Sequence, residues 1–341
     1  MIPQNVITNW SLAHPWPNAD QVEQDLLLAQ AICVIASDDL LGRELVIRGG
    51  TAFHKLYLPR PFRYSEDLDY VRTTTGGIGA IMRRLTDMGK RLGYVVRTQM
   101  GQHPKVFWRY STVSGRRGKI KIEINTFERS PMLPLASRTL DVASPWCACR
   151  QDIPTFQAEE LVATKLRALY QRSKGRDLFD LWLALTVLEL EPASIVAAFP
   201  AYRPEGVTAR LMRTNLDQKL ADHEFRHDCD KLILGGADSC GYDALEAGAL
   251  VDRALLSLLR ATHALTHARI WIYRKGRQSR ARCEPSRHAK LARTSALFRR
   301  SRLLELRITC YLAFDRIAHN AVRIQMGEVN MRERTMNSHD G

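Results

Sequence analysis

Apolar and polar residues alternate with two different periods along the 341 residues of this chain. Between residues 44 and 127 the apolar runs are short, and residues 119–127 (KIKIEINTF) alternate strictly, with Ile120, Ile122 and Ile124 on one side. Such alternation is typical of a β-strand with one buried face. From residue 157 onward the apolar residues recur at helical spacing. The pattern therefore predicts an α+β protein in which a sheet precedes a helical region.

The expected elements follow from these periods and from the turn residues between them. We expect strands at 44–48, 65–71, 94–98, 105–112 and 119–127, with a hairpin turn at 114–118. We expect helices at 20–41, 51–57, 76–93, 157–172, 176–190, 193–199, 206–213, 216–234 and 242–259. Residues 130–154 are rich in proline, and we interpret them as an irregular domain junction with one short strand at 138–142.

The formal net charge of +14 is distributed unevenly. Lys and Arg exceed Asp and Glu by 3 in residues 1–262 and by 11 in residues 263–341. The tail at 263–341 is either a basic arm that attracts RNA or an appended segment without selected structure. Because the tail holds most of the charge, the composition does not indicate a DNA-binding protein.

The cysteines and the apolar runs narrow the class of protein further. The seven cysteines have no regular spacing, which argues against a disulfide framework. Cys147 and Cys149 form the one close pair, and no second pair stands at the distance that a zinc site needs. No run approaches the ~20 apolar residues of a membrane span. The first residues do not form a secretory signal, so we expect a cytoplasmic protein without a membrane partner.

Candidate chemistry is concentrated in residues 48–70 (RGGTAFHKLYLPRPFRYSEDLDY). Gly49, Gly50 and Thr51 follow a short apolar strand and precede a helix, so their backbone can approach a phosphate and offer it N–H donors. Asp67 and Asp69 alternate to the same face of the next strand. Neighbouring carboxylates repel each other unless a cation lies between them, and Mg²⁺ accepts carboxylate oxygens while leaving positions for phosphates. The stretch therefore predicts a Mg²⁺ site, with Mn²⁺ as a substitute, beside a phosphate site.

The strings GGT and SEDLD, separated by a basic loop, resemble the first motif of the AbiEii/AbiGii-type nucleotidyltransferase toxins of type IV toxin–antitoxin systems. This family belongs to the polymerase-β-like nucleotidyltransferase superfamily. Later strings, ELVATKLRAL at 160–169 and RDLFDL at 176–181, resemble the family's later motifs, so the likeness covers roughly residues 20–260. It implies a nucleotidyltransferase fold with a mixed β-sheet flanked by helices at 1–150, followed by an α-helical domain at 151–262.

The resemblance also implies roles for residues outside the first motif. A third acidic residue on a neighbouring strand completes the metal site of the superfamily, and Glu123 fits that place. Lys165 would contact the phosphates of the nucleotide, and Asp177 would be the later acidic residue near the site. Arg63 and Ser65 would join Gly49–Thr51 in binding the nucleotide.

Each of these roles has a structural alternative. Glu123 can lie on a solvated sheet face, and Asp177 can complement the dipole of its helix. Lys165 can extend its stem to water and pair with Glu159 or Glu160, and Arg63 can be ordinary surface charge. We also expect His54 to be a partly exposed helix residue. Asp180 can be a helix cap or an ion-pair partner of Arg176.

The implied activity is metal-dependent transfer of a nucleotide from an NTP to an acceptor. Because related toxins modify the 3′ end of tRNA, tRNA is the first expected acceptor. The implied partner is a separate antitoxin with a winged-helix DNA-binding domain. Two alternatives remain open: a GTP- or NTP-binding regulatory module without transfer, and a nucleotidyltransferase that modifies protein.

Overall fold

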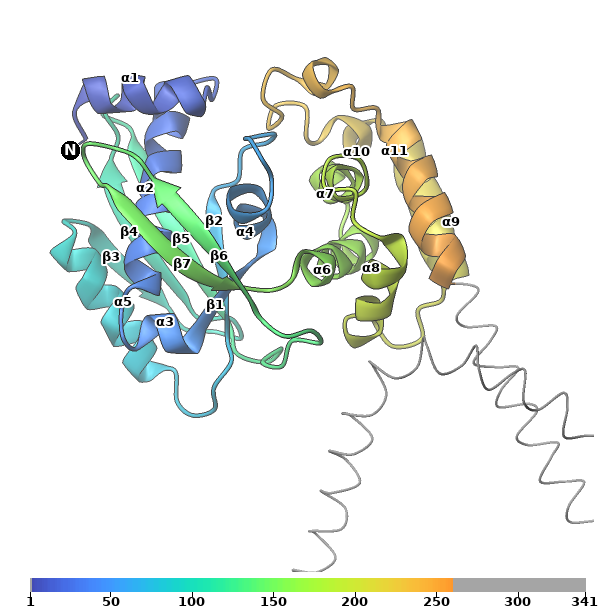
Figure 1. The fold of residues 1–341 in the computed structure, drawn as a ribbon, viewed down its shortest axis with the longest axis horizontal. Coiled ribbons are helices and arrows are strands. Elements are labelled where there is room, and N and C mark those ends of the chain that lie inside the picture. Colours follow the sequence, from blue (N-terminus) through green and yellow to red (C-terminus); the bar gives the residue numbers. More distant parts are fainter. Residues whose placement is uncertain (1, 260–341) are drawn as a thin grey trace, which may run out of the picture. The chain divides into compact units, whose positions relative to one another are not determined.

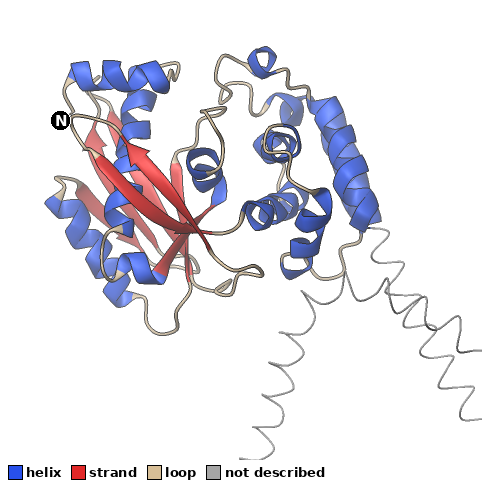
Figure 2. Ribbon diagram, in the orientation of Figure 1, coloured by secondary structure: helices blue, strands red, loops and turns tan. Residues whose placement is uncertain are grey.

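The structure, a computed structural model, describes residues 2–259, which all belong to one compact unit. The basic tail predicted at 263–341 lies outside the described residues. A mixed seven-stranded sheet with helices packed around it forms the N-terminal part, and a group of helices follows (Figures 1 and 2). The predicted α+β class is therefore confirmed. No helix among residues 2–259 combines the length and apolar character needed to cross a membrane.

The sheet contains both parallel and antiparallel strand pairs. Its strands are β1 (Leu45–Arg48), β2 (Asp67–Arg72), β3 (Val95–Gln99), β4 (Lys105–Ser111), β5 (Arg117–Asn125), β6 (Ala136–Val142) and β7 (Cys149–Thr155). Their order in the sheet is β3-β4-β5-β2-β1-β7-β6. Strand β2 runs parallel to β5 and antiparallel to β1, so residues far apart in the sequence become neighbours at the centre of the sheet.

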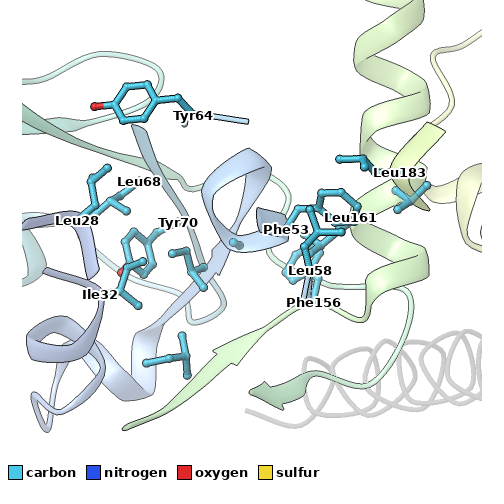
Figure 3. Packing of buried hydrophobic residues seen from close by; sticks show 14 of the residues in the cluster. Leu28, Ile32, Phe53, Leu58, Tyr64, Leu68, Tyr70, Phe156, Leu161 and Leu183 are labelled. Atoms are coloured by element: carbon cyan, nitrogen blue, oxygen red, sulfur yellow. The ribbon is translucent and has the colours of Figure 1, made fainter. Parts of the chain in front are cut away.

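Five helices surround this sheet. They are α1 (Gln4–Ala13), α2 (Ala19–Ala36), α3 (Leu41–Glu44), α4 (Gly49–Leu56) and α5 (Gly79–Arg91). Asn18 caps α2 by accepting a hydrogen bond from the backbone N–H of Gln21, and it is one of the two caps, Asn18 or Asp20, that the sequence suggests for this helix. Leu28 and Ile32 of α2 lie beside Leu68 and Tyr70 of β2 in the buried core (Figure 3). Because side chains alternate along a strand, this packing leaves Asp67 and Asp69 on the opposite face of β2.

The helical segment consists of α6 (Ala158–Gln171), α7 (Gly175–Thr186), α8 (Pro192–Ala198), the 3₁₀ turn η1 (Phe199–Ala201), α9 (Ala209–Ala221), α10 (His223–His227), the 3₁₀ turn η2 (Ala237–Cys240), α11 (Ala244–Val251) and the π-helical turn η3 (Asp252–Leu256). Three apolar side chains are buried close together where this segment meets the sheet: Phe53 of α4, Phe156 just before α6, and Leu161 of α6 (Figure 3). Shared apolar burial of this kind fixes α4 and α6 against each other.

The C-terminus of α6 depends on one buried lysine from α9. The Lys219 ammonium donates hydrogen bonds to the backbone carbonyls of Leu169, Tyr170 and Arg172. These carbonyls have no hydrogen-bond donor within the helix and lie at the negative end of its dipole. A buried cation supplies the missing donors and also compensates the negative end. We expect Lys219→Met to lower the free energy of unfolding by about 2–4 kcal/mol, measured by urea denaturation.

Lys174→Met is the matched control, because Lys174 is exposed and pairs with Asp228 at 3.3 Å. Its effect should stay below about 1 kcal/mol. Equal losses in the two variants would contradict the capping role of Lys219.

Several predicted elements need correction. Residues 149–155, expected to be irregular, form β7, which carries few buried apolar residues and contains Pro154. Helix α1 was not expected. The single helix expected at 216–234 is divided, because Asp222 adopts an extended backbone and caps α10 through the N–H of Glu224. The structure also pairs Cys33 with Cys149 in a disulfide that the cysteine spacing did not suggest.

Strand β7 extends the sheet past residue 150, and the helical segment begins with α6. The division into domains at 150 and 262 remains a prediction.

Candidate active site

Strands β2 and β5 bring three acidic side chains to one region. In their parallel pairing Asp69 lies opposite Glu123, and Asp67 lies opposite Lys121. Asp67, Asp69 and Glu123 therefore project from the same side of the sheet, and all three line a cavity of about 580 Å³. The three residues expected from sequence to form the metal site are thus neighbours in the fold.

Two lysines lie among these carboxylates. Lys121 Nζ is 2.8 Å from Asp67 Oδ2 and 3.4 Å from Glu123 Oε2, and Lys105 Nζ is 3.5 Å from Glu123 Oε2. Burial and the nearby charge of Asp67 nevertheless raise the pKa of Asp69, which Lys121 only partly offsets. The cluster therefore retains an excess of negative charge that a further cation would relieve.

Carboxylate oxygens are suitable ligands for a divalent cation, but the side chains are not arranged around a common metal position. Hard oxygen donors beside a phosphate site are the ligands that Mg²⁺ prefers. Within residues 2–259, no group of three or more His, Cys, Asp or Glu side chains is arranged to hold a metal ion. The ammonium of Lys121 lies between Asp67 and Glu123.

The paired glycines allow helix α4 to begin directly against this cluster. Gly49 has φ +83°, and a Cβ at this position would lie 2.5 Å from Asp69 Oδ2. A Cβ on Gly50 would lie 2.7 Å from a guanidinium nitrogen of Arg63. Thr51 Oγ1 donates to the carbonyl of Asp67 at 2.5 Å and lies 2.9 Å from Ser65 Oγ, which fixes α4 to the start of β2. The helix therefore starts at Gly49 rather than at Thr51, and its first N–H groups lie near the carboxylates.

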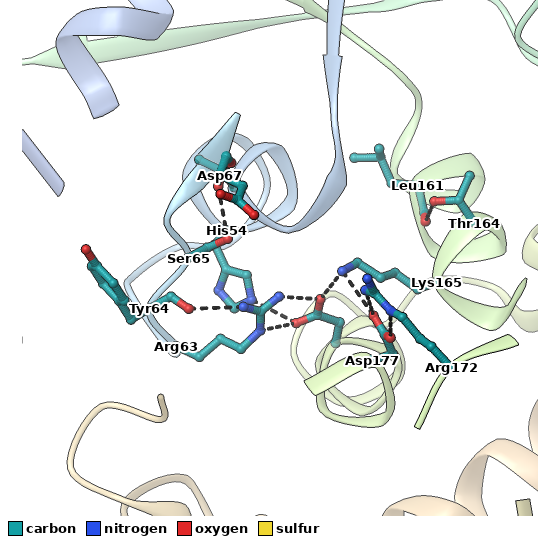
Figure 4. A network of polar contacts seen from close by, with 12 residues as sticks. His54, Arg63, Tyr64, Ser65, Asp67, Leu161, Thr164, Lys165, Arg172 and Asp177 are labelled. Atoms are coloured by element: carbon teal, nitrogen blue, oxygen red, sulfur yellow. Dashed lines mark hydrogen bonds and ion pairs between the residues drawn. The ribbon is translucent and has the colours of Figure 1, made fainter. Parts of the chain in front are cut away.

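A buried ionic network lies next to the cavity (Figure 4). Asp180 of α7 accepts two hydrogen bonds of 2.7 Å from Arg63 and one of 2.9 Å from His54, and its Oδ2 is 2.8 Å from Lys165 Nζ. Asp177 pairs with Lys165 at 3.4 Å and with Arg172 at 2.7 Å. Burial alone would raise the pKa of both aspartates, but the surrounding cations hold them below the ordinary value.

The network corrects several expectations. The partner of Lys165 is neither Glu159 nor Glu160, because Glu160 accepts hydrogen bonds from the backbone of residues 132 and 133 and from Tyr202. Arg63, with 3% exposure, is not surface charge. Asp180 neither caps a helix nor pairs with Arg176, since its three partners come from α4, α6 and the loop before β2.

His54 is also placed differently from its expected position. It is buried rather than partly exposed, and it bonds to Asp180. Burial, together with the positive charge of Arg63, lowers the pKa of His54 to about 4. The folded protein therefore favours the neutral imidazole, whereas an unfolded chain would protonate it below about pH 6.5.

This difference predicts a pH dependence of stability. Between about pH 6.5 and pH 4 the unfolded chain binds the additional proton, so stability should fall by up to about 3 kcal/mol as the pH decreases. Urea denaturation across this range should show a smaller fall for His54→Gln, which keeps an N–H donor for Asp180. His227→Gln, which changes an exposed histidine, should retain the full dependence. Identical profiles for all three proteins would contradict the prediction.

The structure adds basic residues that the sequence did not identify. Arg48, Arg167, Arg172 and Arg176 line the cavity together with Lys165. Glu128 pairs with both Arg48 and Arg167, and although burial opposes its charge, these partners lower the pKa of Glu128 to about 2. Arg172 lies just before α7 and Arg176 lies in its first turn, close to the family motif at 176–181. Arg48 directly precedes Gly49 and Gly50 in the chain. The cavity thus has carboxylates on the sheet side and cations contributed largely by α6 and α7.

A mixed sheet with carboxylates on adjacent strands beside a Gly-Gly helix start defines a nucleotidyltransferase. The family model of the AbiEii nucleotidyl transferase toxins of type IV toxin–antitoxin systems matches residues 31–248, more than half of the chain, and the chain belongs to this family. The protein is therefore a nucleotidyltransferase toxin. Membership implies an NTP substrate and a cognate antitoxin.

The fold is shared with the solved structure of a toxin. MenT4, a nucleotidyltransferase toxin from Mycobacterium tuberculosis H37Rv, is 17% identical with a TM-score of 0.52, and the match covers 75% of this chain and 90% of that chain. JHP933 from Helicobacter pylori is also 17% identical, with a TM-score of 0.44 and coverage of 73% and 97%. No curated protein matches the sequence significantly.

Proposed function

We propose that this toxin transfers a nucleotide from an NTP to a hydroxyl group of an RNA, with tRNA as the first candidate. The observation that carries the proposal is one cavity that holds both halves of such a site. Asp67, Asp69 and Glu123 line it from the sheet, and Lys165 and Arg172 line it from the helical segment. Metal ligands and phosphate ligands are the two groups that phosphoryl-transfer chemistry requires.

We propose further that Asp67, Asp69 and Glu123 hold Mg²⁺ or Mn²⁺. A divalent ion bound there would clamp the phosphate oxygens and lower the pKa of the attacking hydroxyl. Lys121 would have to leave Asp67 for these carboxylates to bind the ion. Its stem is long and flexible, so a rotamer change can achieve this without moving the strand.

The residues of the chain itself then have distinct tasks. The N–H groups at Gly49 and Gly50 bind phosphate oxygens, and Ser65 supports them through Thr51. The acceptor oxygen forms a bond to the α-phosphorus, the bond from that phosphorus to the pyrophosphate oxygen breaks, and a carboxylate of the cluster accepts the hydroxyl proton. Lys165 and Arg172 offset the charge that develops on the departing pyrophosphate.

In this scheme Asp177 and Arg63 act through other residues. Asp177 is fully buried and contacts Lys165 and Arg172, so it fixes the directions of these two cations. Arg63 reaches the cavity wall, but its Nε and Nη2 donate to Asp180 and its Nη1 donates to the carbonyl of Tyr64. We therefore assign Asp177 and Arg63 to positioning rather than to direct contact with the nucleotide.

Incubation with each α-³²P-labelled NTP in the presence of total tRNA and Mg²⁺ tests the proposal. Covalent label in the RNA is the expected result. Label in protein would instead identify a protein-modifying transferase, and retention of unincorporated NTP would identify a binding module; either result would overturn the assignment. We propose that the antitoxin that the family implies is a separate winged-helix protein.

A further inference from the structure

Two aromatic rings stand at the edge of the cavity beside the carboxylates. Phe127 is 64% exposed, which is unusual for a phenylalanine. Its ring centroid is 5.9 Å from that of His103, and the two rings are perpendicular. His103 lines the cavity together with Glu123 and Asn125. The exposed ring therefore lies near the proposed reaction site rather than at a random surface position.

Local hydrogen bonds hold Phe127 in its exposed position. Asn125 ends β5, and its side-chain oxygen accepts hydrogen bonds from the backbone N–H groups of Phe127 at 2.8 Å and Glu128 at 3.0 Å. This Asx turn fixes the direction in which the chain leaves the strand. Glu128 is anchored in turn by Arg48 and Arg167, which both line the cavity.

His103 is held near the end of β5 by the start of the neighbouring strand β4. Pro104 follows it, and the Pro104 carbonyl accepts a hydrogen bond of 2.9 Å from the N–H of Ile124. The antiparallel register pairs Lys105 with Glu123, so His103 and Phe127 both lie just beyond the carboxylate Glu123 at one end of the β4–β5 pair. Both rings therefore lie in bends that directly flank the paired strands β4 and β5, on the strand that also carries Glu123 and on its neighbour.

We propose that the exposed ring of Phe127, supported edge to face by His103, forms a stacking platform for the unpaired terminal base of the RNA acceptor. This inference rests on the proposed RNA-directed transfer. An acceptor hydroxyl on a terminal ribose must approach Glu123, and the attached base then needs a surface close by. Unpaired bases stack on aromatic side chains, and each such contact contributes about 1–3 kcal/mol without requiring a particular base. The platform therefore suits an acceptor whose terminal base is unpaired.

The test compares Phe127→Ala and Phe127→Trp in the full-length protein with a tRNA transcript as acceptor. Phe127→Ala should raise the KM for the transcript about 5- to 100-fold while the KM for the NTP stays unchanged. Phe127→Trp should restore the KM, because any large aromatic ring can stack. Leu12→Ala is the matched control, since Leu12 is an exposed apolar residue of α1, and it should have no effect.

An acceptor whose terminal nucleotide lacks its base provides the decisive comparison. With the wild-type protein this acceptor should lose as much affinity as Phe127→Ala loses with the intact acceptor, and combining the two changes should cause no further loss. Multiplied losses, or an unchanged KM in Phe127→Ala, would overturn the stacking platform alone. Absence of any label in RNA with the wild-type protein would instead overturn the proposed function.

Discussion

Replacing Asp69 with asparagine is expected to reduce nucleotide transfer about 1000-fold or more while the protein remains folded. Asp69 lies at the centre of the carboxylate cluster, opposite Glu123 and against the Gly49 end of α4. Losing one anionic ligand should remove about 4 kcal/mol or more of transition-state stabilisation. The α-³²P-NTP assay with saturating Mg²⁺ measures the loss.

Thermal unfolding of the same variant separates chemistry from stability. Burial and the charge of Asp67 raise the pKa of Asp69, so ionising this carboxyl costs the folded state stability. Asparagine removes that buried charge, and the melting temperature of Asp69→Asn should equal or exceed that of the wild type. Asp141→Asn, on the exposed face of β6, is the control and should retain full activity. An active Asp69→Asn protein would exclude the proposed metal site.

Replacing Asp180 with alanine is expected to have the opposite profile, with a large loss of stability. Asp180 is fully buried and compensates Arg63 and Lys165, and it accepts the hydrogen bond of His54. Its removal takes away the carboxylate that Arg63 contacts and leaves Lys165 with Asp177, so the free energy of unfolding should fall by about 3–5 kcal/mol. Urea denaturation at pH 7 gives this value directly.

Acidic pH should reproduce part of the effect in the wild-type protein. Because the pKa of Asp180 is depressed in the folded state, its stabilising charge is present above the unfolded value near 4 and is lost only as the pH falls well below it. Asp141→Ala breaks the exposed pair between Asp141 and Arg150 and should change stability by less than about 1 kcal/mol. A similarly small change in Asp180→Ala would show that the buried network does not support the fold.

These two predictions distinguish the two sides of the cavity. On the sheet side, like charges are gathered at a cost to stability, which is typical of a site arranged for ligand binding. On the helical side, each anion is matched by cations, and Lys165 belongs to both because it pairs with Asp180 and still lines the cavity. The network therefore holds a phosphate-binding cation in place while keeping its charge compensated.

Local sequence was sufficient for the parts of the protein that depend on neighbours in the chain. Strict alternation at residues 119–127 predicted β5, and a cap at Asn18 or Asp20 predicted the start of α2, because both are determined by a few consecutive side chains. The repulsion between Asp67 and Asp69 also follows from their spacing alone. Strand β7 was missed for the same reason, since its burial comes from pairing with β6 and β1 rather than from its own composition.

Tertiary structure alone decided which distant residues share the cavity and which charges are compensated. Spacing placed Asp67 and Asp69 on one face of a strand, but the parallel register of β2 with β5 is what brings Lys121 and Glu123 beside them. Likewise, sequence offered nearby partners for Lys165 and Asp180, whereas the fold pairs Asp180 with Arg63, 117 positions away. Short-range patterns encode local conformation, but the energy of a buried charge depends on every group packed around it, and those groups meet only in the folded chain.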